Sequence, residues 1–176
     1  GDFMNIAING FGRIGRLILK VALENNLNVV AVNSTSDSKI KAYYLKYDTL
    51  YGKYDKEVSY GKDYIKINKI KIKSLVERDI SKLPWKKLKV DFVVEATGIF
   101  KDKHLAQEHL VAGAKKVFIT APSKDPDVTL VPGVNNEMLK KEHKIISVAS
   151  CTTNCLAPMV KVLDDKFKIA KGFATT

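Results

Sequence analysis

A mostly apolar segment that runs directly into a glycine-rich turn is the feature that most constrains the fold of this chain. Residues 4–9 read MNIAIN, and residues 10–15 read GFGRIG. In a strand, turn and helix with this spacing, Gly10 makes the tight turn, Gly12 lets a pyrophosphate approach the backbone, and Gly15 lets the helix pack closely on the strand. The segment therefore predicts a buried strand followed by a dinucleotide-binding turn.

The residues after the turn strengthen this interpretation. Residues 13–25 have helical spacing, with an expected apolar face formed by Ile14, Leu17, Ile18, Val21 and Ala22. The next strand is expected over residues 27–32. A glycine-rich turn alone could serve packing only, but strand, turn, helix and strand in this order predict that the helix N-terminus faces phosphates.

The end of the second strand bears on the choice of cofactor. The dinucleotide fingerprint places an acidic residue there, which binds the adenosine ribose. This chain has the sequence NSTS at residues 33–36, and Asp37 falls at the expected start of a helix over residues 39–45, where we interpret it as an N-terminal helix residue. Without a carboxylate to repel a 2′-phosphate, and with the hydroxyls of Ser34, Thr35 and Ser36 as donors, the loop favours NADP over NAD.

The remaining pattern indicates one α/β domain. A chain of 176 residues, 45% of them hydrophobic, can bury a core of this size. Apolar strands expected over residues 5–8, 29–32, 91–95, 116–120 and 145–149 alternate with amphipathic helices, which predicts a Rossmann-like, doubly wound, mostly parallel sheet. Residues 57–76 break the alternation with period-two segments at 64–67 and 70–73, and predict an antiparallel insertion with a lysine-rich, solvated face.

A second informative segment is SCTTNC at residues 150–155, between an apolar stretch and a helical pattern over residues 156–167. Cys151 is expected in the first helical turn, where unpaired N–H groups and the helix dipole favour the thiolate and can hold the oxygen of an attacked carbonyl. A buried, inert cysteine is the alternative. The polar neighbours of Cys151 favour a reactive thiol, whereas Cys155 precedes apolar residues and is expected to be a packing residue.

Together these motifs closely resemble the phosphorylating glyceraldehyde-3-phosphate dehydrogenases. INGFGRIGR at residues 8–16 and SCTTNC at residues 150–155 carry most of the resemblance. Shorter matching runs stand between them in the family's order: LKYD at 45–48, ERD at 77–79, LPW at 83–85, EATG at 95–98, AGAKKV at 112–117, TAP at 120–122 and GVN at 133–135. The resemblance therefore extends over the whole chain.

The resemblance implies a reaction at Cys151. Its thiol would form a thiohemiacetal with glyceraldehyde 3-phosphate, hydride would pass to the nicotinamide, and inorganic phosphate would cleave the resulting thioester to give 1,3-bisphosphoglycerate. Ser150, Thr152 and Thr153 would bind the substrate and the phosphate, and Asn154 would support the turn of the nucleophile. The enzyme would serve glycolysis or, with NADP, gluconeogenesis.

The resemblance also implies a set of contacts with NAD or NADP. The pyrophosphate, the ribose, the adenine side and the rest of the cleft would be contacted by Gly10, Phe11, Gly12, Arg13, Ile14, Gly15, Asn33, Ser34, Arg78, Thr97, Gly98 and Thr120. The family usually has Asp at the position of Ser34, so its preference for NAD does not transfer to this chain.

The chain stops near the position where the family has its catalytic histidine. His104 and His109, in a helix expected over residues 103–112, and His143, in a charged loop, do not match that base and are expected on the helix surface or in the loop. We therefore expect a dinucleotide domain over residues 4–150. Residues 151–176 are expected to comprise the nucleophile helix and the start of the catalytic domain of a longer, homotetrameric protein. The isolated chain is expected to bind cofactor and to be nearly inactive.

Three other readings remain. The net charge of +11 fits a dinucleotide- or RNA-binding module, but the lysines are dispersed, which favours a solvated surface and at most weak RNA binding. Oxidation of erythrose 4-phosphate is a sister activity that the resemblance allows. A dinucleotide-binding fragment without catalysis would leave the Cys151 segment unexplained.

The sequence also predicts several absences. Two cysteines four residues apart with no histidine nearby make neither a disulfide framework nor a metal site. No apolar run approaches the roughly 18 residues of a membrane span, and no signal peptide is present, so a cytosolic protein is expected. Residues 1–3 ahead of Met4 are interpreted as a cloning remnant.

Overall fold

The computed structural model describes residues 4–176, so the remnant predicted for residues 1–3 lies outside the described part. Its helices are α1 (Arg13–Glu24), α2 (Ser38–Lys46), α3 (Lys103–Ala106), α4 (Glu108–Val111) and α5 (Cys151–Phe167), with 3-10 turns η1 (Ile80–Lys82) and η2 (Asn136–Met138). Its strands are β1 (Asn5–Asn9), β2 (Asn28–Asn33), β3 (Tyr47–Asp48), β4 (Gly52–Lys53), β5 (Val58–Tyr60), β6 (Tyr64–Ile67), β7 (Ile70–Leu75), β8 (Phe92–Glu95), β9 (Lys116–Ile119), β10 (Val128–Thr129) and β11 (Ile145–Ser147).

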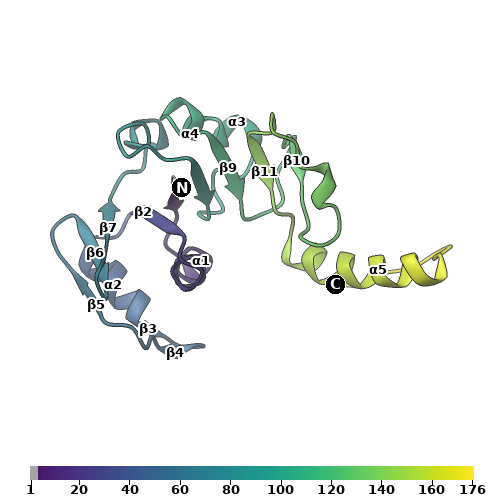
Figure 1. The fold of residues 1–176 in the computed structure, drawn as a ribbon, viewed down its shortest axis with the longest axis horizontal. Helices are drawn as coiled ribbons and strands as arrows, with labels where there is room; N and C mark the ends of the chain where they lie inside the picture. The colour runs from purple at the N-terminus through teal and green to yellow at the C-terminus, as the bar shows by residue number, and fades with distance from the viewer. Residues whose placement is uncertain (1–3) are drawn as a thin grey trace.

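The main sheet has nine strands in the order β10-β11-β9-β8-β1-β2-β7-β6-β5 (Figure 1). The strands from β10 to β7 pair in parallel, so their carboxyl ends lie along one edge. Strands β2 and β7 lie on one side of β1, whereas β8, β9 and β11 lie on the other. The direction of winding therefore reverses between β1 and β8, where open α/β sheets bind ligands, and the predicted doubly wound sheet is confirmed.

The predicted antiparallel insertion is also confirmed. Strands β5, β6 and β7 pair antiparallel, and a tight turn at Asn68, with φ of 50°, joins the last two. Ile65, Ile67 and Ile72 are buried, while Lys66 and Lys71 are exposed, as period-two alternation requires. Because β7 also pairs in parallel with β2, the insertion extends the main sheet.

Hydrophobic cores lie on both faces of the sheet. Ala7 packs in a cluster with Trp85, and its neighbour Ile8 packs in a second cluster with Leu19 and Leu45. Successive residues of one strand point to opposite faces, so β1 contributes to both cores. Strand β1 is thereby held from two sides at the point where the glycine turn begins.

Helix α1 forms where it was predicted, but the expected apolar face is wrong by part of a turn. Gly15, Leu19 and Ala22 are buried, whereas Ile14 and Val21 are 48% and 56% exposed. A Cβ on Gly15 would lie 1.9 Å from the carbonyl oxygen of Gly10. This close approach fixes which side of the helix faces the sheet, and a helix with apolar residues on most sides does not reveal it by periodicity.

The helix expected over residues 103–112 is divided into α3 and α4. The prediction that His109 is a surface residue is wrong, because His109 is fully buried. Its side chain forms hydrogen bonds with Trp85 and Glu95, which belong to other parts of the fold. His104 is exposed on α3, as predicted, and His143 lies in the loop before β11.

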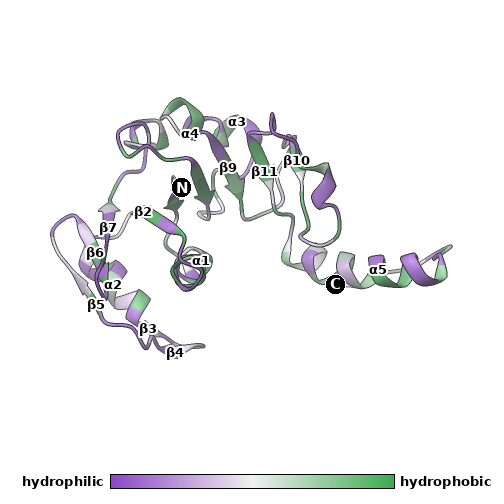
Figure 2. Cartoon of the chain, in the orientation of Figure 1, coloured by the Kyte–Doolittle hydropathy of each residue, from purple (hydrophilic) through white to green (hydrophobic). Residues whose placement is uncertain are grey.

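Helix α5 projects away from the sheet (Figure 1), and none of its residues is buried. Both hydrophobic and hydrophilic residues occur along this exposed helix (Figure 2). The interior position expected for Cys155 is therefore wrong, since both cysteines are exposed. The apolar pattern that suggested packing has no partner surface among the described residues. No helix in residues 4–176 combines the length and the apolar character that crossing a bilayer requires.

Candidate active site

A cavity of about 510 Å³ lies at the carboxyl ends of β1, β2 and β8, at the point where the sheet reverses direction. Residues of the glycine turn, of the loop after β2, of the segment after β7 and of the loop after β8 surround it. Of the predicted cofactor residues, the lining includes Gly10, Phe11, Gly12, Asn33, Ser34, Arg78 and Thr97. Residues from four separate stretches of sequence thus meet in one cleft.

The other predicted cofactor residues do not line this cavity. Arg13 and Ile14 are exposed at the start of α1, and Gly15 is buried beneath the turn. Gly98 stands between two lining residues, Thr97 and Ile99. The Thr120 hydroxyl lies one strand away and donates to the Glu95 carbonyl at 3.1 Å.

The glycine turn has the geometry that a dinucleotide phosphate requires. Gly10 has φ of 97°, and a Cβ there would lie 2.5 Å from the backbone carbon of Ala96. By contrast, no atom lies within 4 Å of the Cβ position of Gly12, so this backbone is open to an approaching group. Gly12 caps α1 without a side-chain hydrogen bond, and the first helical turn has no acidic residue. The uncapped N–H groups of this helix end therefore fit a pyrophosphate.

One end of the cleft, predicted from the sequence to border the adenosine of a dinucleotide, is formed by residues 33–36 and 77–78. The Asn33 amide donates to Asn9 Oδ1 at 2.7 Å and to the Glu77 carbonyl at 2.9 Å, and its oxygen accepts from Glu77 N at 3.0 Å. Its polar atoms are therefore engaged within the protein. Asp37 caps α2 by accepting from Ile40 N at 2.8 Å, which confirms the predicted helix-start role.

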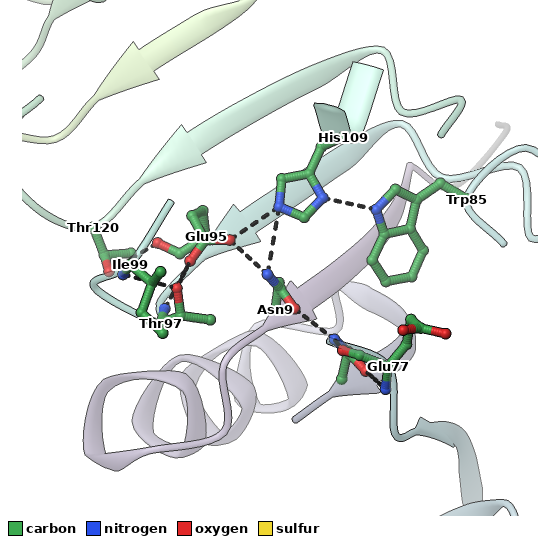
Figure 3. A network of polar contacts seen from close by, with 9 residues as sticks. Asn9, Glu77, Trp85, Glu95, Thr97, Ile99, His109 and Thr120 are labelled. Atoms are coloured by element: carbon green, nitrogen blue, oxygen red, sulfur yellow. Dashed lines mark hydrogen bonds and ion pairs between the residues drawn. The ribbon is translucent and has the colours of Figure 1, made fainter. Parts of the chain in front are cut away.

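A buried polar network supports the floor of the cleft (Figure 3). The Trp85 indole donates to His109 Nδ1 at 3.0 Å, so His109 must carry its proton on Nε2, which lies 2.9 Å from Glu95 Oε2. The Asn9 amide donates to the same carboxylate oxygen at 2.6 Å. The other oxygen accepts from the backbone and hydroxyl of Thr97.

This network links residues that line the cavity to residues that do not. Asn9 and Thr97 line the cavity, while Trp85 and His109 lie behind it with no exposed surface. The Glu95 carboxylate has four donors, so its charge is satisfied internally and it orients the Thr97 loop. Sequence reasoning missed this role, although Asn9 and Glu95 each end an otherwise apolar strand and could have been recognised as buried polar residues.

Helix α5 begins at Cys151, as predicted, and its first turn is held by neighbouring side chains. Ser150 is the N-cap and accepts from Thr153 N at 2.9 Å, while the two hydroxyls lie 2.8 Å apart. The Asn154 amide donates to the carbonyls of Val148 at 2.7 Å and of Ser150 at 2.9 Å. The turn is therefore fixed by contacts within seven consecutive residues, with the Cys151 thiol exposed.

The structure places the thiol turn at the same sheet edge as the cleft, because β11 is parallel to its neighbours and α5 follows its carboxyl end. The lining of the cavity includes no residue of α5, and Thr152 makes no side-chain hydrogen bond among the described residues. Seven of the predicted cofactor residues are thus brought together in the cavity, while the thiol turn lies outside its lining. Within residues 4–176, no group of three or more metal-ligating side chains is arranged around a common point.

Comparisons with known families agree with this arrangement. The family model for the NAD binding domain of glyceraldehyde 3-phosphate dehydrogenase matches residues 4–103. The model for the C-terminal domain of the same enzyme matches residues 150–176. The two matches fall on the dinucleotide cleft and on the thiol turn with its helix.

Curated relatives give the same result. Glyceraldehyde-3-phosphate dehydrogenase of Thermotoga maritima is 51% identical over 174 residues, which make up 97% of this chain and 52% of that protein. Glyceraldehyde-3-phosphate dehydrogenase 2 of Bacillus subtilis is 51% identical over 98% of this chain and 52% of its own length. Glyceraldehyde-3-phosphate dehydrogenase 1 of Saccharomyces cerevisiae is 50% identical with the same coverage. The chain spans about half the length of the curated relatives it matches.

Proposed function

The chain belongs to the glyceraldehyde 3-phosphate dehydrogenase family, and on that premise we propose that it provides the dinucleotide site and the nucleophile for phosphorylating oxidation of glyceraldehyde 3-phosphate. One observation carries the proposal. An exposed cysteine opens α5 at the sheet edge that also bears the cleft, in a turn whose hydroxyl and amide groups are already positioned.

The first turn of α5 suits attack on an aldehyde. Ser150 occupies the N–H of Thr153, whereas the N–H groups of Cys151 and Thr152 form no backbone hydrogen bond within the described residues. In the proposed reaction the Cys151 thiolate adds to the aldehyde carbon, and these N–H groups stabilise the oxygen that gains the negative charge. After oxidation the substrate is an acyl thioester on Cys151. Inorganic phosphate attacks this carbonyl and the thiolate leaves.

The residues of the cleft fit a nicotinamide dinucleotide, which when bound supplies the acceptor for the hydride of the substrate. Gly10, Phe11 and Gly12, with the start of α1 at Arg13 and Ile14, would hold its pyrophosphate. Its adenosine half would be bordered by Asn33, Ser34 and Arg78. Its nicotinamide half would be bordered by Thr97, Gly98 and Thr120. Ser150, Thr152 and Thr153 would bind the phosphate groups of the substrates.

We further propose that NADP is preferred over NAD. The amide of Asn33 is engaged with Asn9 and Glu77, and the carboxylate of Asp37 caps α2, so neither side chain is free to bind the ribose hydroxyls. The loop that lines the cleft instead presents Ser34, Thr35 and Ser36. Hydroxyl groups can donate to a 2′-phosphate that a carboxylate would repel.

The remaining parts of the proposal concern the whole protein. The three relatives described above are named for glyceraldehyde 3-phosphate, which favours this substrate over erythrose 4-phosphate. A homotetramer and a cytosolic location belong to the same proposal, which subunit counting and cell fractionation of the parent protein can test. We expect the 176-residue chain alone to bind cofactor with little turnover, because it spans about half the length of its relatives.

Alkylation of the two cysteines tests the role of Cys151. Both thiols are exposed, so each serves as a control for the other. We expect iodoacetamide to modify Cys151 faster than Cys155, and glyceraldehyde 3-phosphate to slow modification of Cys151 only, as read by mass spectrometry of peptides. Stronger protection by erythrose 4-phosphate would favour the sister activity. Equal rates for both thiols, without protection, would contradict the proposal.

A further inference from the structure

Lys41 is a buried lysine next to the adenosine end of the cleft. It lies on α2, and only 1% of its surface is exposed. Its Nζ donates to the Ser36 carbonyl at 2.6 Å and to the Leu75 carbonyl at 2.7 Å. Ser36 belongs to the loop that lines the cleft, and Leu75 ends β7 just before the lining residues Glu77 and Arg78. One ammonium group therefore ties together both walls of this end of the cleft.

The position of this cation is costly if its role is packing alone. Its neighbours on the buried face of α2 include Ala42 and Leu45, where an apolar side chain would serve the core. Burial lowers the pKa of Lys41 to about 8, although the Asp37 carboxylate acts in the opposite direction. No salt bridge to Lys41 forms among the described residues, so its charge is solvated by two carbonyls only.

The Lys41 ammonium contacts the loop after β2, and the end of β2 is where the dinucleotide fingerprint ordinarily places a carboxylate. That carboxylate binds a free ribose and repels a 2′-phosphate. Here the position at the end of β2 is Ser34, whose Oγ accepts from Ser36 N at 3.3 Å. The loop thus combines hydroxyl groups on its cleft side with a positive charge on its other side. The other charged groups around it are Asp37, Glu77 and Arg78.

We propose that Lys41 is a specificity-determining residue for NADP, its buried ammonium providing the counter-charge for the 2′-phosphate while Ser34, Thr35 and Ser36 offer the direct hydrogen bonds. This inference rests on the dinucleotide binding proposed above. A buried charge is screened by salt far less than a surface lysine. The preference it creates therefore persists at high ionic strength.

The test uses two probes that occupy only the adenosine half of the cleft, 2′,5′-ADP and 5′-AMP. Calorimetry of the 176-residue chain is expected to give tighter binding of 2′,5′-ADP. Lys41→Met should weaken the binding of 2′,5′-ADP about tenfold or more, because the 2′-phosphate loses a nearby counter-charge, and should change the binding of 5′-AMP less than about twofold. Lys39→Met, an exposed lysine on the same helix, is the matched control and should change neither.

Each outcome separates the inference from the function on which it rests. Binding of neither probe by the native chain contradicts dinucleotide binding and with it the role of Lys41. Equal binding of both probes overturns the NADP preference and the role of Lys41 together. If Lys41→Met still prefers 2′,5′-ADP, or if its affinity for both probes falls equally, only the proposed role of Lys41 is overturned. Lys41 would then be a purely structural link between the two walls of the cleft.

A second measurement does not depend on the folding of a variant. In the native chain, the ratio of the two affinities should decline as pH rises from 7 to 9, because Lys41 loses its charge near pH 8. The other ionisable groups around this end of the cleft are Asp37, Glu77, Arg78 and Tyr44. If the Lys41→Met variant folds, the pH dependence of its affinity ratio reports the titration of these four groups without Lys41. A ratio that stays constant in the native chain would overturn the proposal.

Discussion

The floor of the dinucleotide cleft and helix α5 differ in how their functional residues are held. Asn9, Glu95 and His109 are each at most 2% exposed, and they hydrogen-bond partners up to 86 residues away in the chain. Helix α5 contains no buried residue, and the contacts of its first turn reach no further than six residues. The cleft is therefore a product of tertiary folding, whereas the thiol turn is determined by its local sequence.

This difference predicts where the domain can tolerate change. Altering the cleft removes interactions on which the cooperative fold depends, so binding and stability should be lost together. Altering α5 should leave the unfolding of the domain unchanged, because the helix contributes little to the shared core.

Glu95→Leu should have the largest effect. The substitution leaves the donors of Asn9, His109 and Thr97 without their acceptor. Because each unsatisfied buried group costs about 1–3 kcal/mol, we expect the free energy of unfolding to fall by about 3 kcal/mol or more. Urea unfolding followed by the fluorescence of Trp85, the single tryptophan, measures it. Glu142→Leu, at an exposed glutamate, is the control and should be neutral. Equal stability of the two variants would contradict a supporting role for the network.

A pair of leucine truncations compares the two regions directly. Leu19 in α1 is fully buried, whereas Leu163 in α5 is 48% exposed. Leu19→Ala should lower the free energy of unfolding by about 2–5 kcal/mol, and Leu163→Ala by less than about 0.5 kcal/mol. Thermal and urea unfolding of both variants measure the difference. A comparable loss for Leu163→Ala would show that α5 packs on a surface and would remove the contrast.

Sequence reasoning succeeded where the signal was local. The glycine turn, the Asp37 cap and the start of α5 at Cys151 each depend on a few adjacent residues, and all three formed as expected. It failed for His109, because that burial depends on Trp85 and Glu95, which lie 24 and 14 residues away. The prediction for Cys155 failed for a different reason. Its apolar neighbours indicate packing, but they do not show whether the surface on which they would pack belongs to this stretch of chain.

Two glycine variants sharpen the description of the cleft. Gly15→Ala would place a Cβ 1.9 Å from a backbone oxygen, and should lower stability by about 1–3 kcal/mol as α1 is displaced. Gly12→Ala meets no atom within 4 Å and has a φ of −73°, so it should be nearly neutral for stability. It should nevertheless weaken dinucleotide binding, since its methyl group occupies the approach to the helix end. Calorimetry and urea unfolding separate the two effects, and unchanged binding in Gly12→Ala would contradict the phosphate site.

The smallest effect concerns Asp127, which precedes β10 and hydrogen-bonds the backbone at the start of β11. Burial raises the pKa of this carboxyl, but the Lys103 ammonium and the N–H groups of Ile145 and Lys144 together lower it to about 2.

Because the pKa of Asp127 is lower in the folded state than its ordinary value of 3.8, its contribution to stability is complete above about pH 4 and is lost as pH falls toward 2. The group is partly exposed, so we expect less than about 1 kcal/mol. Urea unfolding at pH 5 and pH 2.5 should show a smaller acid-induced loss in Asp127→Asn than in the native chain, with the exposed Asp125→Asn as control. An identical loss in all three proteins would mean that the β10–β11 edge, like α5, lies outside the cooperative core to which the cleft belongs.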